Sequence, residues 1–141
     1  MLLDTDTIKI IKTAKTIAVV GCSPKAYRDS NSVALYLMEQ GYGVVPVNPK
    51  HDVILDVKAY PDLLAAREGE GPIDIVDIFR ASELVMPHVE EAIQIGTRLI
   101  WMQMGVINEE AALRARQADI TVVMDQCLRT QHKELRRQRL L

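Results

Sequence analysis

The stretch Ile17-Ala18-Val19-Val20-Gly21-Cys22-Ser23-Pro24 decides the fold, because a short apolar run stops there abruptly at a glycine. A polar loop over residues 25–29 follows, and a helical pattern then opens at Ser30-Asn31 and stops at Gly41. A β-branched run that ends in glycine and feeds a helix is the first half of a βαβ nucleotide-binding unit. The pattern therefore predicts a strand, a tight turn and a helix.

The predicted turn has the properties of an anion site. Gly21 allows a tight turn and the close approach of a ligand, and the free N–H groups at a helix start favour an anion. Side-chain donors that suit a phosphate are Ser23, Arg28, Ser30 and Asn31. Neither the G-x-G-x-x-G fingerprint nor the Gly-Lys-Ser/Thr of a P-loop is present. Phosphate binding and a plain strand–turn–helix connection both remain open from the spacing alone.

Apolar runs alternate with helical patterns along the rest of the chain. Further strands are predicted at residues 42–47, 57–60, 73–79, 99–105 and 120–124, and helices at 4–14, 63–66, 87–95, from 109 onward and at 128–141. Short crossovers of this kind are right-handed and build a parallel sheet covered on both faces. We therefore expect a single α/β domain over residues 1–141. It is a Rossmann-like three-layer fold with a mostly parallel sheet of five or slightly more strands, an N-terminal helix within 1–14 and a basic C-terminal helix.

Three residues inside these strands carry a prediction about position. Pro46 would cost a hydrogen bond in a central strand, so it is expected at an unpaired edge or at the end of its strand. Asp74 and Asp77 interrupt an otherwise apolar strand. We expect them either at the start of that strand or where an edge meets water. The loop 68–72 is predicted to end the helix that begins at residue 63.

The end of the second strand bears on the kind of nucleotide. An NAD-binding unit carries an acidic residue there, which holds the ribose 2′-hydroxyl. This chain has Asn48-Pro49-Lys50 instead. A cation suits a phosphorylated ribose and disfavours plain NAD. The alternative is a solvated lysine in a proline-rich loop.

Four strand ends bring the distinctive residues to one place. The carboxyl ends of parallel strands share one edge of the sheet, and ligands bind there where the strand order reverses. The four groups are Gly21-Cys22-Ser23, Asn48-Pro49-Lys50, Phe79-Arg80 and Gln103-Met104-Gly105. Their convergence predicts a ligand site at this edge better than any single motif does.

The bulk properties narrow the classes of partner. The 141 residues carry a net charge of −2, which favours neither nucleic acid nor an anionic membrane. No apolar run approaches the ~18 residues of a membrane span, and no signal pattern opens the chain. Two widely spaced cysteines predict free thiols in a reduced cytoplasmic setting. No metal site is expected, because the pair Cys127 and His132 has no further ligand nearby in the sequence.

The chain resembles the small stand-alone CoA-binding proteins, which are Rossmann-type domains similar to the CoA-binding domain of the succinyl-CoA synthetase alpha subunit. The resemblance covers Lys15 to Cys127, and the combination of Val-Asn-Pro-Lys with Trp-x-Gln-x-Gly is its most specific part. The stretches that carry it are 17–23, 45–50, Tyr60-Pro61, Phe79-Arg80, 101–105, 108–111 and 122–127.

The resemblance implies coenzyme A or an acyl-CoA as the ligand. Gly21 and Ser23 would hold the pyrophosphate and Lys50 the 3′-phosphate. Asn48 and Pro49 would flank the adenosine. The pantetheine arm would run along Phe79, Arg80, Gln103 and Gly105, and Arg28 is a further phosphate candidate. Cys22 would lie beside the pyrophosphate, where it is either a reactive thiol or a small loop residue that fits.

The expected function is a binding or regulatory module without catalysis of its own, since no nucleophile paired with a base is evident. Cys22 is expected to be the only thiol on the ligand-facing edge. The alternatives are an NADP- or nucleotide-dependent enzyme and a CoA-binding subunit of a larger acyl-CoA enzyme. The first would need a proton donor such as Tyr-x-x-x-Lys, which is absent. The sequence leaves a homo-oligomer or a partner subunit open.

Overall fold

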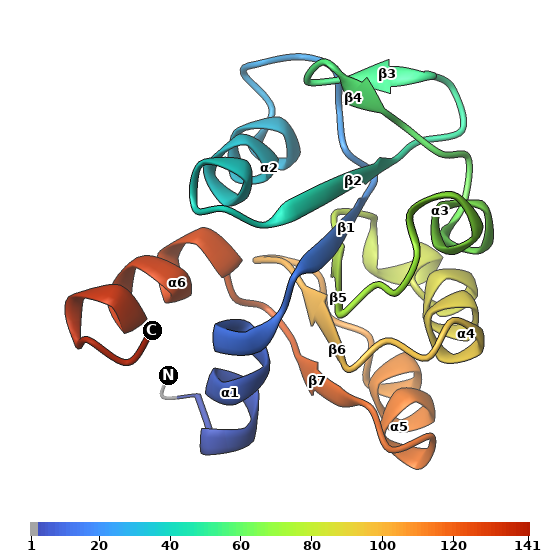
Figure 1. Cartoon of the computed structure of the whole chain (residues 1–141). Coiled ribbons are helices and arrows are strands. Elements are labelled where there is room, and N and C mark those ends of the chain that lie inside the picture. Colours follow the sequence, from blue (N-terminus) through green and yellow to red (C-terminus); the bar gives the residue numbers. More distant parts are fainter. Residues whose placement is uncertain (1–2) are drawn as a thin grey trace.

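A five-stranded parallel sheet forms the centre of the computed structural model, which describes residues 3–141 (Figure 1). Its strand order is β2-β1-β5-β6-β7, and every neighbouring pair is parallel. The strands are β1 (Thr16–Val20), β2 (Gly43–Val47), β5 (Ile75–Ile78), β6 (Leu99–Met102) and β7 (Thr121–Val123). The predicted α/β fold with a mostly parallel five-stranded sheet is confirmed.

Helices cover both faces of the sheet, so the domain has three layers (Figure 1). On one face pack α1 (Thr5–Thr13), α2 (Asp29–Glu39) and α6 (Leu128–Arg137). On the other face pack α3 (Leu63–Glu70), α4 (Met86–Gln94) and α5 (Glu109–Gln117). The basic helix α6 ends before residue 141, and residues 1–2 of the predicted N-terminal segment lie outside the described residues.

The order of the strands reverses between β1 and β5. From β1 the chain crosses to β2 on one side, whereas the later strands follow on the other side through β5, β6 and β7. The two neighbouring crossovers therefore leave β1 and β5 in opposite directions. Such a switch point opens a crevice at the carboxyl ends of the strands.

Pro46 lies in the edge strand β2, as its missing N–H group predicts. Its carbonyl oxygen accepts a hydrogen bond from the N–H of Tyr60 at 3.0 Å, and the N–H of Asn48 donates to the carbonyl of Tyr60 at 2.8 Å. Tyr60 follows a small hairpin of β3 (Val53–Ile54) and β4 (Val57–Lys58). The sequence indicates only one of these two short strands.

Helix α3 runs through the residues that were predicted to be a loop. It continues to Glu70 and includes Gly69, so the prediction that the helix ends at a loop over 68–72 is wrong. The glycine does not mark a loop but leaves room for the ring of Tyr60, since a Cβ atom at position 69 would lie 2.4 Å from the Tyr60 hydroxyl oxygen. Glycine thus serves packing here, and the Tyr60 hydroxyl donates to the carboxylate of Glu70.

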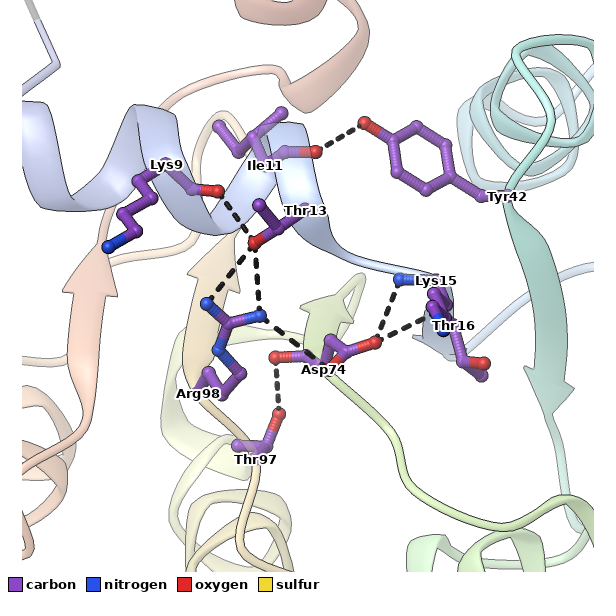
Figure 2. A network of polar contacts seen from close by, with 9 residues as sticks. All are labelled: Lys9, Ile11, Thr13, Lys15, Thr16, Tyr42, Asp74, Thr97 and Arg98. Atoms are coloured by element: carbon purple, nitrogen blue, oxygen red, sulfur yellow. Dashed lines mark hydrogen bonds and ion pairs between the residues drawn. The ribbon is translucent and has the colours of Figure 1, made fainter.

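Asp74 lies directly before β5. This agrees with the first of the two positions predicted for it, the start of the strand. Its Oδ2 accepts the backbone N–H groups of Lys15 at 2.8 Å and Thr16 at 3.1 Å (Figure 2). Arg98 approaches the other carboxylate oxygen at 3.8 Å and donates to the Thr13 hydroxyl. These contacts fasten the end of α1 to the amino-terminal edge of the sheet, opposite the strand ends that carry the predicted site.

Asp77 contradicts its prediction, since it lies neither at the start of a strand nor at an edge. It is in β5, the middle strand, between Val19 of β1 and Trp101 of β6. Its side chain is 0% exposed, and neither carboxyl oxygen has a hydrogen-bond partner among the described residues. Burial, and then the charge of Cys127, raise its pKa well above the ordinary value, which favours the neutral form of this carboxyl.

Candidate ligand-binding site

Three adjoining hollows lie at the carboxyl end of β1 and β5, and Phe79 lines all three. The loop hollow has a volume of about 760 Å³ and is lined by Gly21, Ser23, Pro24, Lys25, Tyr27, Arg28, Asp29, Ser30, Asn48, His51 and Phe79. The Lys50 hollow, of about 370 Å³, lies beside Pro49, Lys50, Arg80 and His88. The Cys127 hollow, of about 390 Å³, lies beside Val33, Phe79, Gln103, Cys127 and Arg129. Together they form one cleft at the switch point.

Gly21 lies where the loop hollow and the Lys50 hollow meet. Its φ is +81°, and a Cβ atom there would lie 2.4 Å from the carbonyl oxygen of Phe79. Its N–H donates to the carbonyl of Val47 at 2.9 Å. Only glycine combines this backbone angle with this close approach. The turn after β1 therefore packs directly against the ends of β2 and β5.

The first turn of α2 holds the loop that follows Gly21. The Ser30 hydroxyl accepts the N–H of Ser23 at 2.9 Å, and the Asn31 amide donates to the Ser23 carbonyl at 2.8 Å. Ser30 and Asn31 are buried and hold the loop in place, and of the two Ser30 also lines the loop hollow. The Ser23 hydroxyl faces the loop hollow and accepts the N–H of Lys25 at 3.1 Å.

The charges around the loop hollow favour an anion. Lys25, Arg28 and His51 line it, and α2 begins there without a side-chain cap, whereas α1, α3 and α5 are each capped by an Asp or Asn side chain. A helix start without a side-chain cap favours an anion through its backbone N–H groups. Asp29 also lines the hollow and opposes the cations with a single negative charge.

The Lys50 hollow brings together two further cations, Lys50 and Arg80. Lys50, Arg80 and His88 line it together with Pro49 and Asn48. Asn48 connects the loops that border the two hollows. Its amide donates to the Cys22 carbonyl at 3.0 Å, and its Oδ1 accepts the N–H of Lys50 at 2.8 Å. Burial, followed by the charge of Arg80, lowers the pKa of His88. Arg80 thus lies beside Lys50, away from Gln103 and the Cys127 hollow.

The side chain of Cys22 does not reach the cleft. It is 0% exposed and packs in the core between the sheet and α2. Burial, and then the charge of Asp77, raise the pKa of its thiol to about 12. Of the two interpretations that the sequence left open, the structure favours a residue that fits the turn. Any ligand contact at this position has to come from the backbone.

The thiol that lines the cleft is Cys127, so the prediction that Cys22 is the only one on this edge is wrong. Cys127 immediately precedes α6 and borders a hollow with Gln103. Gln103 is almost fully buried, and its Oε1 accepts the N–H of Leu128 at 3.1 Å. Gly105 lies on the same loop, where its N–H donates to Asp125 at 2.7 Å, and it lines none of the three hollows.

The sequence missed several residues that line the cleft, namely Lys25, Tyr27, Asp29, His51, His88, Cys127 and Arg129. Most of them lie in loops or at helix starts, where no period in the sequence marks a side chain as facing a ligand. Tyr27 carries the clearest signal that could have been used. It is an aromatic residue between Lys25 and Arg28, it is 75% exposed, and both cations lie within 6.0 Å of its ring centre.

Comparison with known proteins decides the family. A sequence model of the CoA binding domain matches residues 15–133. The chain belongs to the CoA-binding domain family. The uncharacterized protein YneT of Bacillus subtilis (strain 168) is 40% identical over 124 residues, which is 88% of this chain and 90% of that relative.

Solved structures agree with this membership. A hypothetical protein from Pyrococcus horikoshii OT3 superposes with a TM-score of 0.88 at 40% identity, over 95% of this chain and 92% of that one. A dinucleotide-forming acetyl-coenzyme A synthetase 1 from Ca. Korarchaeum cryptofilum superposes with a TM-score of 0.72 at 19% identity, over 86% of this chain and 28% of that one. This second likeness shows a shared fold. In this chain, the residues that match the CoA-binding domain contain the whole five-stranded sheet.

Within residues 3–141, no group of three or more His, Cys, Asp or Glu side chains is placed to hold a metal ion. None of the helices in the described part of the chain has the length and apolar character needed to cross a membrane.

Proposed function

We propose that the protein binds coenzyme A or an acyl-CoA at the carboxyl edge of its sheet, as a binding or regulatory module. The observation that carries the proposal is the pair of cation-lined hollows that meet at Gly21 and Phe79. CoA carries two separate phosphate groups, a pyrophosphate and a 3′-phosphate, with an adenosine between them. A ligand of that kind matches two neighbouring cationic hollows better than one with a single phosphate cluster.

The proposed position of the ligand follows the charges. The pyrophosphate lies in the loop hollow against the uncapped start of α2 and Ser23, with Arg28 and Lys25 nearby. The 3′-phosphate lies in the Lys50 hollow, near Lys50 and Arg80. Asn48 and Pro49 flank the adenosine between them. The pantetheine arm then passes Phe79, which borders the Cys127 hollow as well.

The first expected result is a preference for CoA over NAD. Lys50 stands where an NAD-binding unit has an acidic residue, so the 3′-phosphate gains an attraction that a free ribose hydroxyl cannot provide. Calorimetric titration of the purified chain with CoA and with NAD at the same ionic strength measures both affinities. Equal or tighter binding of NAD would contradict the proposal.

A second expected result separates the two phosphate groups. If Lys50 pairs with the 3′-phosphate, Lys50→Ala should weaken the binding free energy of CoA by about 1–3 kcal/mol, which is typical of a charge-assisted hydrogen bond. Dephospho-CoA should respond little to the same change. Lys9→Ala is the matched control, because it removes the same charge from an exposed position on α1, at the opposite edge of the sheet. A similar loss for both ligands would assign Lys50 to another group.

A further inference from the structure

We propose that Cys127 is the reaction site for a disulfide of CoA and becomes linked to the CoA thiol as a mixed disulfide. This inference rests on the proposed function, because it places the thiol end of the bound ligand in the Cys127 hollow. It goes beyond binding, since it assigns a covalent step to a residue that the predicted site did not include.

Geometry places Cys127 at the far end of the cleft. The Cys127 hollow and the loop hollow share two lining residues, Phe79 and Asp29. An arm that starts at a pyrophosphate in the loop hollow therefore leads past Phe79 toward Cys127. Val33 and Val106 add apolar walls to this second hollow, and Gln103 adds an amide. This lining suits a pantetheine arm, which alternates methylene groups with amides.

The surroundings of Cys127 favour the thiolate form. Burial alone would raise the pKa of its thiol. Hydrogen bonds from the backbone N–H and hydroxyl of Thr130, from Gln103 and from the N–H of Arg129 outweigh this effect and hold the pKa below its ordinary value. The donors of Arg129 and Thr130 belong to the first turn of α6, whose dipole adds to the effect, whereas Gln103 follows β6. The thiolate is the form that attacks disulfides.

A second, independent observation is the unpartnered carboxyl of Asp77. It is fully buried, has no hydrogen-bond partner among residues 3–141, and interacts electrostatically with both Cys22 and Cys127. An unpaired carboxyl in a core costs stability and is uncommon. Its neutral form, which the raised pKa favours, does not repel a negatively charged sulfur. The fold thus keeps an unpaired buried carboxyl near enough to Cys127 for the charge of the thiolate to act on it.

The proposed step is a thiol–disulfide exchange. The Cys127 thiolate attacks one sulfur of a CoA disulfide, so that a bond forms between Cys127 Sγ and that CoA sulfur as the bond between the two CoA sulfurs breaks. The second CoA leaves as a thiolate and takes a proton from water. One disulfide is consumed and one is formed, so no further oxidant is needed.

The same thiol is poorly equipped for acyl transfer. That reaction needs N–H donors that stabilise an oxyanion, and the N–H groups of Arg129 and Thr130 already point to the thiol. Exchange with a disulfide needs only an accessible thiolate. Cys22 has no exposed surface and a raised pKa, so it cannot displace the bound CoA by a second exchange. We therefore expect the mixed disulfide to persist at one per chain.

The test uses the reduced full chain with CoA disulfide and, in parallel, with glutathione disulfide. Intact mass spectrometry should show one added CoA, less two hydrogen atoms, with release of one equivalent of CoA thiol. Because the cleft positions its own ligand, CoA disulfide should react about tenfold faster than glutathione disulfide or more. Cys127→Ser should abolish the adduct. The matched variant Cys22→Ala, whose changed side chain lies outside the cleft, should keep it.

Three outcomes would overturn the inference: no adduct, an adduct that peptide mapping places on Cys22, or equal rates for the two disulfides. Calorimetry with reduced CoA tests the proposed function, which is non-covalent binding, separately from the covalent step. Wild-type protein that binds CoA but forms no adduct contradicts only the covalent step. Protein that reacts with both disulfides alike and does not bind CoA contradicts both. Cys127→Ser should unfold at the same temperature as the wild type, which shows that the variant is folded.

Discussion

Gly21→Ala is expected to destabilise the fold by about 2–5 kcal/mol and to abolish CoA binding. The left-handed backbone angle costs a non-glycine residue about 1–2 kcal/mol, and the forced movement of packed groups adds about 1–3 kcal/mol. The movement is forced because the new Cβ would lie 2.4 Å from a backbone atom, the carbonyl oxygen of Phe79. The end of β5 and the turn after β1 must then separate, which disrupts the centre of the proposed site.

Gly41→Ala is the matched control for this prediction. Its φ of +96° carries a comparable backbone strain, yet no atom lies within 4 Å of the added Cβ. We expect it to cost only the backbone term, about 1–2 kcal/mol, and to leave CoA affinity unchanged. Thermal unfolding and calorimetry on both variants provide the comparison. Equal losses in the two variants would mean that the contact with Phe79 relaxes freely and does not define the cleft.

Asp77→Asn is expected to stabilise the protein increasingly as the pH rises. The pKa of Asp77 is raised well above 3.8 in the folded state, first by burial and then by Cys127. Between these two pKa values the folded chain keeps a proton that the unfolded chain has released. Raising the pH therefore lowers stability by about 1.4 kcal/mol per pH unit across that window. The asparagine amide does not titrate and removes this loss.

Urea unfolding of both proteins from pH 4 to pH 8 tests this expectation. The difference in unfolding free energy between variant and wild type should be smallest near pH 4 and should grow upward until the folded pKa is passed. Asp74→Asn is the control, because its carboxylate accepts two backbone N–H groups. That change should cost about 1–2 kcal/mol. A constant difference between Asp77→Asn and wild type would show that Asp77 is charged in the fold.

The strand ends were the part of the site that sequence could predict. One apolar run stops at Gly21 and another stops at Asn48-Pro49-Lys50. Local sequence alone predicts a strand end at each place, and the structure has β1 and β2 end there. Parallel strands then bring their carboxyl ends to one edge whatever their order. For that reason Gly21, Asn48, Phe79 and the residues beside them could be grouped without knowing which strands are neighbours.

The features that the sequence did not predict depend on contacts between segments far apart in the chain. Asp77 was assigned to an edge because an acid inside an apolar strand usually meets water, but strand order places it in the middle. Gly69 was assigned to a loop because the packing of Tyr60 cannot be read from residues 68–72. Cys127 reaches the cleft because α6 returns across the sheet to pack beside α2. None of these leaves a periodic signal in the sequence.

The pairing of Tyr60 with β2 bears on how copies of this protein could associate. By strand alternation, the backbone groups of β2 that point away from β1 belong to residues 44, 46 and 48. Pro46 has no N–H, and its carbonyl and the N–H of Asn48 are already taken by Tyr60. A foreign strand would find almost nothing to bond there, so edge-to-edge growth into aggregates is blocked. Self-assembly through a continuous sheet is therefore disfavoured along β2, and any dimer formed on that side has to use helical or loop surfaces.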